Sequence, residues 1–145
     1  MDYKQITVTQ KNKTSFILAI VSIITSLFSI ISYFLPFFSA ESFFGNISMT
    51  GIEALEEAFE KSEMPESGII YALVAVILAL IMSIIGIKKR NSLVGTIFFS
   101  FLAMIMIYIG IADDMEYISS GFYFFELSSL ASAITSIFSL AMKNK

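Results

Sequence analysis

The run GIIYALVAVILALIMSIIGIKKR, residues 68–90, decides how this chain folds. Between Gly68 and Ile87 it contains no charged side chain, and it then ends in three basic residues, Lys88, Lys89 and Arg90. A helix of about 20 apolar residues, rising 1.5 Å per residue, crosses the roughly 30 Å hydrocarbon layer of a bilayer. The run therefore predicts a transmembrane helix that ends at a basic boundary.

Three similar runs occupy residues 15–38, 92–112 and 122–142, and the last contains one carboxylate, Glu126. Within lipid, only helices and closed barrels satisfy the backbone polar groups. Barrel strands have about 9–11 alternating residues, whereas these runs are longer and do not alternate. The first run also exceeds the about 7–15 apolar residues of a signal peptide, which favours an uncleaved anchor. We expect an all-α membrane protein with four transmembrane helices.

The composition excludes several chemistries. Apolar residues make up 57% of the chain and charged residues 14%, against about 25% charged residues in soluble domains. The chain has no Cys, His or Trp, which removes thiolate chemistry and the commonest general base and metal ligand. Asp113, Asp114 and Glu116 resemble part of a metal site in composition only, and no partner motif accompanies them. We expect no enzymatic activity, no cofactor, no metal and no nucleic-acid partner.

Basic residues predict the orientation, because Lys and Arg accumulate on the cytoplasmic side of membrane proteins. They occur in the tail 1–14, in the turn 88–91 and in the end 143–145. The two long connections, 39–67 and 113–121, contain one basic residue, Lys61, and most of the acidic residues. Both termini are therefore expected in the cytoplasm, with Lys88, Lys89 and Arg90 as topology anchors. The Ile-, Phe-, Lys- and Ser-rich composition favours a bacterial cytoplasmic membrane.

Small residues recur on every span at alternating spacings of four and three, which is a period of 3.5 and is typical of left-handed supercoiling. In lipid, helices associate through close packing of such residues. We therefore expect a left-handed four-helix bundle, although the Ser and Thr faces have an alternative interpretation as a polar pathway. The predicted seam comprises Ser15, Ala19, Ser22, Ser26, Ser29, Tyr33; Gly68, Ala72, Ala75, Ala79, Met82, Gly86; Ser92, Thr96, Phe99, Ala103, Met106, Gly110; and Gly121, Phe125, Ser128, Ser132, Thr135, Ser139.

The first outer connection contains the signature of a short amphipathic helix at about 51–62. Thr50 and Glu53 have the spacing of a capping box, in which each side chain bonds the backbone N–H of the other residue. Ile52, Leu55 and Phe59 fall on one face and form an apolar edge, which we expect to bind a partner. The glutamates beside it lack the loop geometry of dedicated calcium sites and are better explained as a solvated face.

Two functions remain in competition. The favoured one is a small non-enzymatic protein that contacts another membrane protein or itself, of an accessory, immunity or envelope-stress type. The alternative is a small oligomeric transporter or channel, because a carboxylate inside a span can mark an ion pathway. Glu126 would then act with Ser128 and Ser132, although its position near the outer end of the span is also explained by contact with water.

Overall fold

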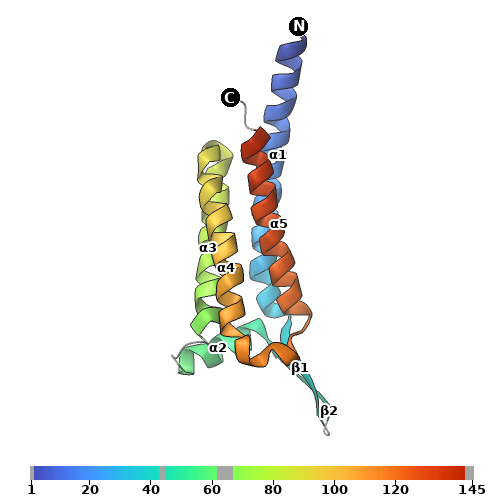
Figure 1. The fold of residues 1–145 in the computed structure, drawn as a ribbon, viewed down its shortest axis with the longest axis vertical. Helices are drawn as coiled ribbons and strands as arrows, with labels where there is room; N and C mark the ends of the chain where they lie inside the picture. Colours follow the sequence, from blue (N-terminus) through green and yellow to red (C-terminus); the bar gives the residue numbers. More distant parts are fainter. Residues whose placement is uncertain (1, 43–44, 62–66, 143–145) are drawn as a thin grey trace.

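The computed structural model describes residues 2–42, 45–61 and 67–142, and its main feature is a bundle of four long helices (Figure 1). The four are α1 (Tyr3–Ile31), α3 (Ser67–Lys88), α4 (Leu93–Gly110) and α5 (Ser120–Met142). With the short 3₁₀ turns that extend α1 and α4, all four are long and apolar enough to cross a membrane. The predicted four-helix membrane bundle is therefore confirmed, and the chain is an integral membrane protein.

The helices form a closed ring. The most extensive contacts join α3 to α4 and α1 to α5, and further contacts join α4 to α5 and α1 to α3. Helices that follow one another in the chain are thus neighbours, and the turn between α3 and α4 needs only the 3₁₀ segment η2 (Arg90–Ser92). Figure 1 shows both ends of the chain at the same end of the bundle as this turn.

Helix α1 begins earlier and ends earlier than the sequence predicts. It starts at Tyr3, so most of the predicted tail 1–14 is a helical extension, which projects beyond the bundle in Figure 1. It ends at Ile31 and is followed by the 3₁₀ turn η1 (Ser32–Phe34), whereas the predicted span ran to residue 38. The cause is Pro36, which lacks an N–H donor and disfavours helical geometry at Leu35, whose φ of −93° and ψ of 158° are extended.

A β-hairpin follows α1, in the connection for which the sequence predicted one short helix and no strand. Strand β1 (Pro36–Ser42) pairs antiparallel with β2 (Gly45–Thr50). Proline is tolerated at the start of a strand, and Gly45 has a φ of 116°, which other residues rarely adopt.

The hairpin is part of a cap on the end of the bundle opposite the termini. This hairpin cap comprises residues 36–42, 45–61 and 112–119: the two strands, α2 (Gly51–Lys61) and the 3₁₀ segment η3 (Ala112–Tyr117). The backbone N–H of Ser119 donates to the Phe37 oxygen at 2.7 Å, and Phe38 forms a β-bridge with Ile118. The second connection, predicted as a plain loop at 113–121, is thus fastened to β1.

An aromatic cluster joins the hairpin cap to the bundle. The rings of Tyr33, Phe37 and Phe125 lie 5.0–6.3 Å apart, and all three side chains are buried. The Tyr33 hydroxyl donates to the Ile69 carbonyl oxygen at 2.9 Å, which satisfies its polar atom and ties η1 to the start of α3. The hairpin is therefore anchored through side chains on η1, β1 and α5.

The predicted seam faces the interior. Most of its members are buried, and the exceptions, Met82, Ser92, Phe99, Met106 and Thr135, are half-buried. Large apolar side chains cover the outside of the helices, as expected when lipid replaces water as the solvent. The seam therefore forms the helix–helix contacts of the bundle.

Candidate functional site

Six buried hydroxyls from all four long helices bond to one another near the middle of the bundle. In this hydroxyl network, the Ser22 oxygen lies 3.1 Å from that of Ser83 and 2.8 Å from that of Ser136. Ser83 continues to Thr96 at 3.0 Å, while Ser132 lies 3.4 Å from Ser22. The sixth member, Ser26, lies 2.8 Å from Ser132. The network thus crosses from α4 through α3 and α1 to α5.

Carbonyl oxygens supply further acceptors for the network. The Ser83 hydroxyl reaches the Ala79 oxygen at 2.9 Å, and the Thr96 hydroxyl reaches the same oxygen at 3.3 Å. Each hydroxyl can donate one hydrogen bond and accept two, so the group can satisfy itself without water. Hydrogen bonds of this kind add modestly to helix association in membranes. The arrangement therefore fits a packing role for the serine faces.

The sequence reasoning missed two members of this network, Ser83 and Ser136, because neither lies on the assumed heptad. Ser83 was nevertheless signalled, since it is the only Ser or Thr between Gly68 and Ile87. A single hydroxyl in an otherwise apolar span is better placed inside the bundle, because lipid offers it no hydrogen bond beyond the one to its own helix. That argument would have placed Ser83 inside the bundle.

Two more serine pairs flank the network along α1 and α5. Towards the hairpin cap, the hydroxyl oxygens of Ser29 and Ser129 lie 3.1 Å apart. Towards the termini, Ser15 donates to the Ser139 carbonyl oxygen at 2.7 Å, and Ser139 donates to the Ser15 carbonyl oxygen at 2.6 Å. The two antiparallel helices are thus joined by serines over most of their shared length.

Arg90 does more than mark the basic boundary. Its Nη1 donates to the carbonyl oxygens of Gly86 at 2.5 Å and Ile87 at 2.7 Å, so it caps the end of α3, where a positive charge is favoured. Its Nε donates to the Ser15 hydroxyl at 3.2 Å, and its guanidinium lies 5.5 Å from the Phe16 ring centre. Lys88 and Lys89, the other two predicted anchors, are exposed.

Glu126 lies on α5 but does not join the hydroxyl network. Its Oε1 is buried and has no hydrogen-bond partner among the described residues. The neighbouring Ser128 hydroxyl donates to the Phe124 carbonyl oxygen at 2.6 Å, one turn back on the same helix. Ser132 is a member of the network. The structure therefore does not join these three predicted pathway residues by hydrogen bonds.

The apolar edge of α2 is divided between the bundle and the surface. The helix begins with the predicted capping box: the Thr50 N–H donates to the Glu53 carboxylate at 2.7 Å, and the Glu53 N–H donates to the Thr50 hydroxyl at 3.2 Å. Ile52 and Leu55 pack against the core, whereas Phe59 is 61% exposed. The most deeply buried face of α2 is instead made of small residues, Gly51, Ala54 and Ala58.

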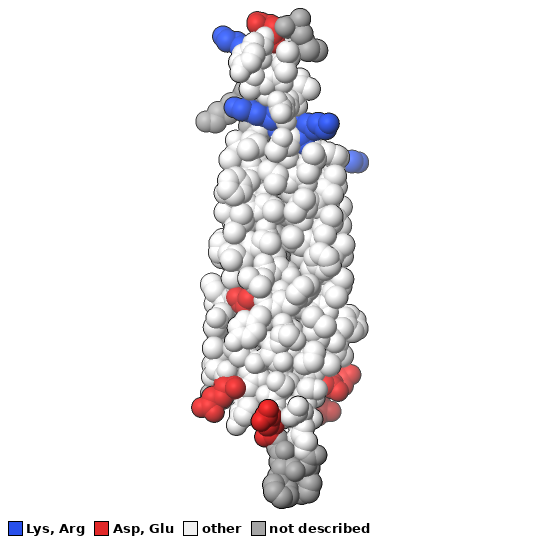
Figure 2. All heavy atoms as spheres, turned by 90° about the vertical axis from the view of Figure 1, so that its right-hand side faces the viewer, with Lys and Arg blue, Asp and Glu red and all other residues white. Residues whose placement is uncertain are grey.

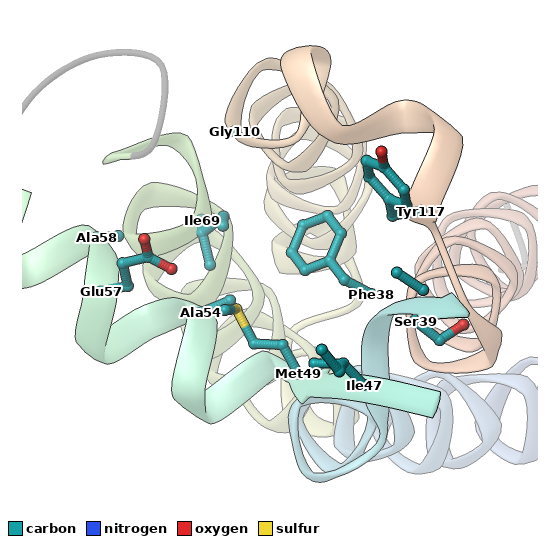
Figure 3. Close-up of a pocket in the computed structure, with 11 residues that line it drawn as sticks. Phe38, Ser39, Ile47, Met49, Ala54, Glu57, Ala58, Ile69, Gly110 and Tyr117 are labelled. Atoms are coloured by element: carbon teal, nitrogen blue, oxygen red, sulfur yellow. The ribbon is translucent and has the colours of Figure 1, made fainter. Parts of the chain in front are cut away.

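The hairpin cap encloses a half-open cavity of about 340 Å³ (Figure 3). The hairpin contributes Phe38, Ser39, Ala40, Ile47 and Met49; α2 contributes Ala54, Glu57 and Ala58; and Ile69, Gly110 and Tyr117 complete the lining. Figure 3 shows the Glu57 carboxylate on one side and the Tyr117 ring on the other, with the Phe38 ring between them. The cavity is mainly apolar and has one carboxylate at its edge.

Charge is divided between the two ends of the molecule. Figure 2 shows the basic side chains near one end and most acidic side chains near the other. Within the described part of the chain, no three acidic side chains come close enough to hold a metal ion. The side chains of Asp113 and Asp114, and the whole of Glu63 and Glu66, lie outside the described residues.

No protein family, curated protein or solved structure matches this chain.

Proposed function

We propose that this membrane protein is not an enzyme and acts by binding another membrane protein, or a second copy of itself, through the hairpin cap. The observation that carries the proposal is the exposure of Ile47 and Phe59 on the cap, at 63% and 61%. Lipid accounts for the exposed apolar side chains along the long helices, whereas the cap lies beyond the helix ends. Aromatic and aliphatic side chains of this kind are typical anchors of protein interfaces.

The proposed orientation follows from charge. The end of the bundle that holds Lys88, Lys89 and Arg90 also holds both ends of the chain, and we assign it to the cytoplasm. The hairpin cap would then face outward, where a partner in the same membrane or envelope can reach it. A bacterial cytoplasmic membrane fits this arrangement and the composition.

The hydroxyl network supports partner binding over transport. Ser22 lies within hydrogen-bond distance of both Ser83 and Ser136, so these hydroxyls are already paired without a permeating ion. A transporter or channel remains the second candidate. The observation that favours it is the buried Oε1 of Glu126, which has no hydrogen-bond partner in the described part of the chain. The two candidates therefore depend on different residues at different depths of the molecule.

A photo-crosslinker placed at position 59 tests the proposal. In the native membrane it should yield a discrete adduct, which mass spectrometry identifies as a second protein or a second copy. Ile47→Asp should remove the adduct without lowering the abundance or thermal stability of the protein, because Ile47 is mostly exposed. Glu60→Gln, a change at an exposed neighbour on α2, is the matched control and should leave it intact. An adduct unaffected by Ile47→Asp, or none at all, contradicts the proposal.

A further inference from the structure

We infer that Arg90 is the centre of a binding site for an organic phosphate, and that the lipid-facing surface beside it points to an anionic phospholipid as the source. The inference is independent of the proposed partner binding, because the hairpin cap lies at the opposite end of the bundle (Figure 1). It is carried by three observations: the fixed position of the Arg90 guanidinium, its unused hydrogen-bond donors and its place at the edge of the lipid-facing surface.

The Arg90 side chain is held from three directions. Its Nη1 donates to two carbonyl oxygens at the end of α3, its Nε donates to the Ser15 hydroxyl on α1, and its guanidinium lies 5.5 Å from the centre of the Phe16 ring. A free arginine side chain loses conformational freedom when it binds a ligand, whereas one that is already fixed loses less. The positive charge is therefore positioned between α1 and the end of α3 before a ligand arrives.

Two donors of this guanidinium remain for a ligand. Arginine has five N–H groups, of which Nε and Nη1 use three in the bonds described above. No described residue bonds the two N–H groups of Nη2. Phosphate oxygens accept strong, charge-assisted hydrogen bonds from such a planar group. The free Nη2 therefore suits one or two oxygens of a phosphate.

The charge near Arg90 favours an anion. Lys88 and Lys89 precede it in the chain, and both are exposed. Among the described residues, the only acid at this end of the molecule is Asp2, at the far tip of the α1 extension. A zwitterionic headgroup would bring its own cation towards these basic groups, whereas an anionic headgroup would not. Basic clusters beside transmembrane helices recognise anionic headgroups for this reason.

The place of Arg90 suits a lipid better than a soluble phosphate. Phe16 and Ile17, at 43% and 49% exposed, belong to the apolar surface that faces lipid, and the half-buried Arg90 lies at its basic edge. Figure 2 shows the basic side chains at this edge of the apolar surface. A phospholipid bound here would place its phosphate on Nη2 and its acyl chains along Phe16 and Ile17.

The absence of Trp from the chain provides a direct assay. Phe16→Trp keeps an aromatic face beside Arg90 and introduces a single fluorophore. In phosphatidylcholine bilayers, brominated phosphatidylglycerol should quench this fluorophore with a binding constant about fivefold above that of brominated phosphatidylcholine, as expected for one basic side chain at the surface. Tyr123→Trp, at an exposed position towards the other end of the bundle, is the matched control and should show no preference for the anionic lipid.

Charge variants in the Phe16→Trp chain separate the site from general electrostatics. Arg90→Gln should lower the preference to less than about twofold, because it removes the charge and both free donors. Lys4→Gln removes the same charge about 16 Å along α1 from Ser15, beyond the screening length of about 10 Å, and should leave the preference unchanged. Because Arg90 also caps α3, unchanged quenching by brominated phosphatidylcholine is the control for folding and insertion.

The chain without a fluorophore gives an independent measurement. In native mass spectrometry from maltoside micelles, it should retain a phosphatidylglycerol adduct in preference to a phosphatidylcholine adduct with the same acyl chains. Arg90→Lys keeps the charge and removes the planar fork, so it should retain less of the phosphatidylglycerol adduct than the unaltered chain and more than Arg90→Gln.

Equal quenching of Phe16→Trp by the two brominated lipids would overturn the inference. A preference that survives Arg90→Gln, or that falls equally in Lys4→Gln, would overturn it as well. A last arm identifies the source of the phosphate. Competition by glycerol 3-phosphate against brominated phosphatidylglycerol supports the inference and assigns the site to soluble phosphate esters also, whereas a preference that persists in its presence supports the inference and assigns a lipid headgroup.

Discussion

Replacing Ser26 by leucine should destabilise the bundle by about 2–4 kcal/mol, because the site has no space for a larger side chain. Ser26 is 2% exposed, and its hydroxyl lies 2.8 Å from that of Ser132 on the facing helix. Overpacking of a tight contact costs about 1–3 kcal/mol, and the lost membrane hydrogen bond adds about 0.6 kcal/mol on average. Steric crowding therefore supplies most of the expected loss.

Two companion variants divide this loss into its parts. Ser26→Ala removes the hydroxyl without adding bulk and should cost only about 0.6 kcal/mol. Leu130→Phe, on the exposed face of α5, also enlarges an apolar side chain and should change stability by less than about 0.5 kcal/mol, because lipid can yield to it. The comparison isolates crowding at the helix contact from a general effect of added volume.

The free energy of unfolding in mixed maltoside and dodecyl sulfate micelles is the measurement. The reasoning fails if Ser26→Leu is as stable as Leu130→Phe, since the serine face would then have room or would face lipid. It also fails if Ser26→Ala is the more damaging of the two Ser26 variants. Ser26→Ala combined with Ser132→Ala should show a coupling of about 0.6 kcal/mol and not more than about 1.7 kcal/mol.

Three further predictions concern two other contacts of the bundle and its orientation in the membrane. Gly68→Leu should cost at least about 2 kcal/mol in the same unfolding assay, because a Cβ there would lie 2.5 Å from the Met106 oxygen and 2.7 Å from the Gly110 nitrogen, both backbone atoms. Arg90→Gln should lower stability by about 1 kcal/mol by removing a charged cap from α3, and an unchanged melting temperature would contradict that role. Cysteines at Lys11 and Ser48, both exposed, should react with an impermeant thiol reagent on intact cells only at position 48; labelling at position 11 would reverse the orientation.

The spans were predictable because one physical requirement decides them. A run such as Gly68–Ile87 has no charge and enough length to cross a bilayer, and few other structures accommodate it. The inward face was predictable for a similar reason, since Ser22, Ala72 and Ser132 are small and helices in lipid pack through small residues. The pairing of individual hydroxyls across helices was not predictable. The spacing of residues along one helix does not fix how each of the four helices is rotated about its own axis relative to its neighbours.

The hairpin was missed because the hydropathy of Phe37 and Phe38 continues that of the first span. Apolar character places a segment away from water but does not distinguish the last turn of a membrane helix from a strand packed beneath the bundle. The decisive signals were local: Pro36, which stops the helix, and Gly45, which permits the turn. Once β1 folds back, Phe37 becomes fully buried beside Tyr33 and Phe125.

The buried face of α2 was missed for a different reason. Ile52, Leu55 and Phe59 dominate any hydrophobic pattern by size, whereas Ala54 and Ala58 contribute little to it. In the structure the alanines are buried, because small side chains allow α2 to approach the bundle closely, and the cavity of the hairpin cap opens beside them. A cavity formed by two strands, a helix and a 3₁₀ turn depends on tertiary packing and has no linear signature.

Glu126 provides the test that separates the two candidate functions. If it exchanges ions, the amide in Glu126→Gln cannot replace it, because Gln keeps the shape and removes the charge. If it has no function, the same variant should be at least as stable as the unaltered chain, since a buried carboxylate oxygen without a described partner is costly. We expect Glu126→Gln to unfold at equal or higher denaturant concentration and to keep the crosslink formed from position 59.

In liposomes, we expect neither the unaltered chain nor Glu126→Gln to dissipate an imposed ion or proton gradient faster than protein-free vesicles. This expectation follows from the pairing inside the bundle. Ser132 bonds within the hydroxyl network and Ser128 bonds its own helix, so neither offers Glu126 a polar continuation. A flux through the unaltered chain that disappears in Glu126→Gln would show that the network opens to a permeating ion. The transport function would then replace partner binding as the better account of this protein.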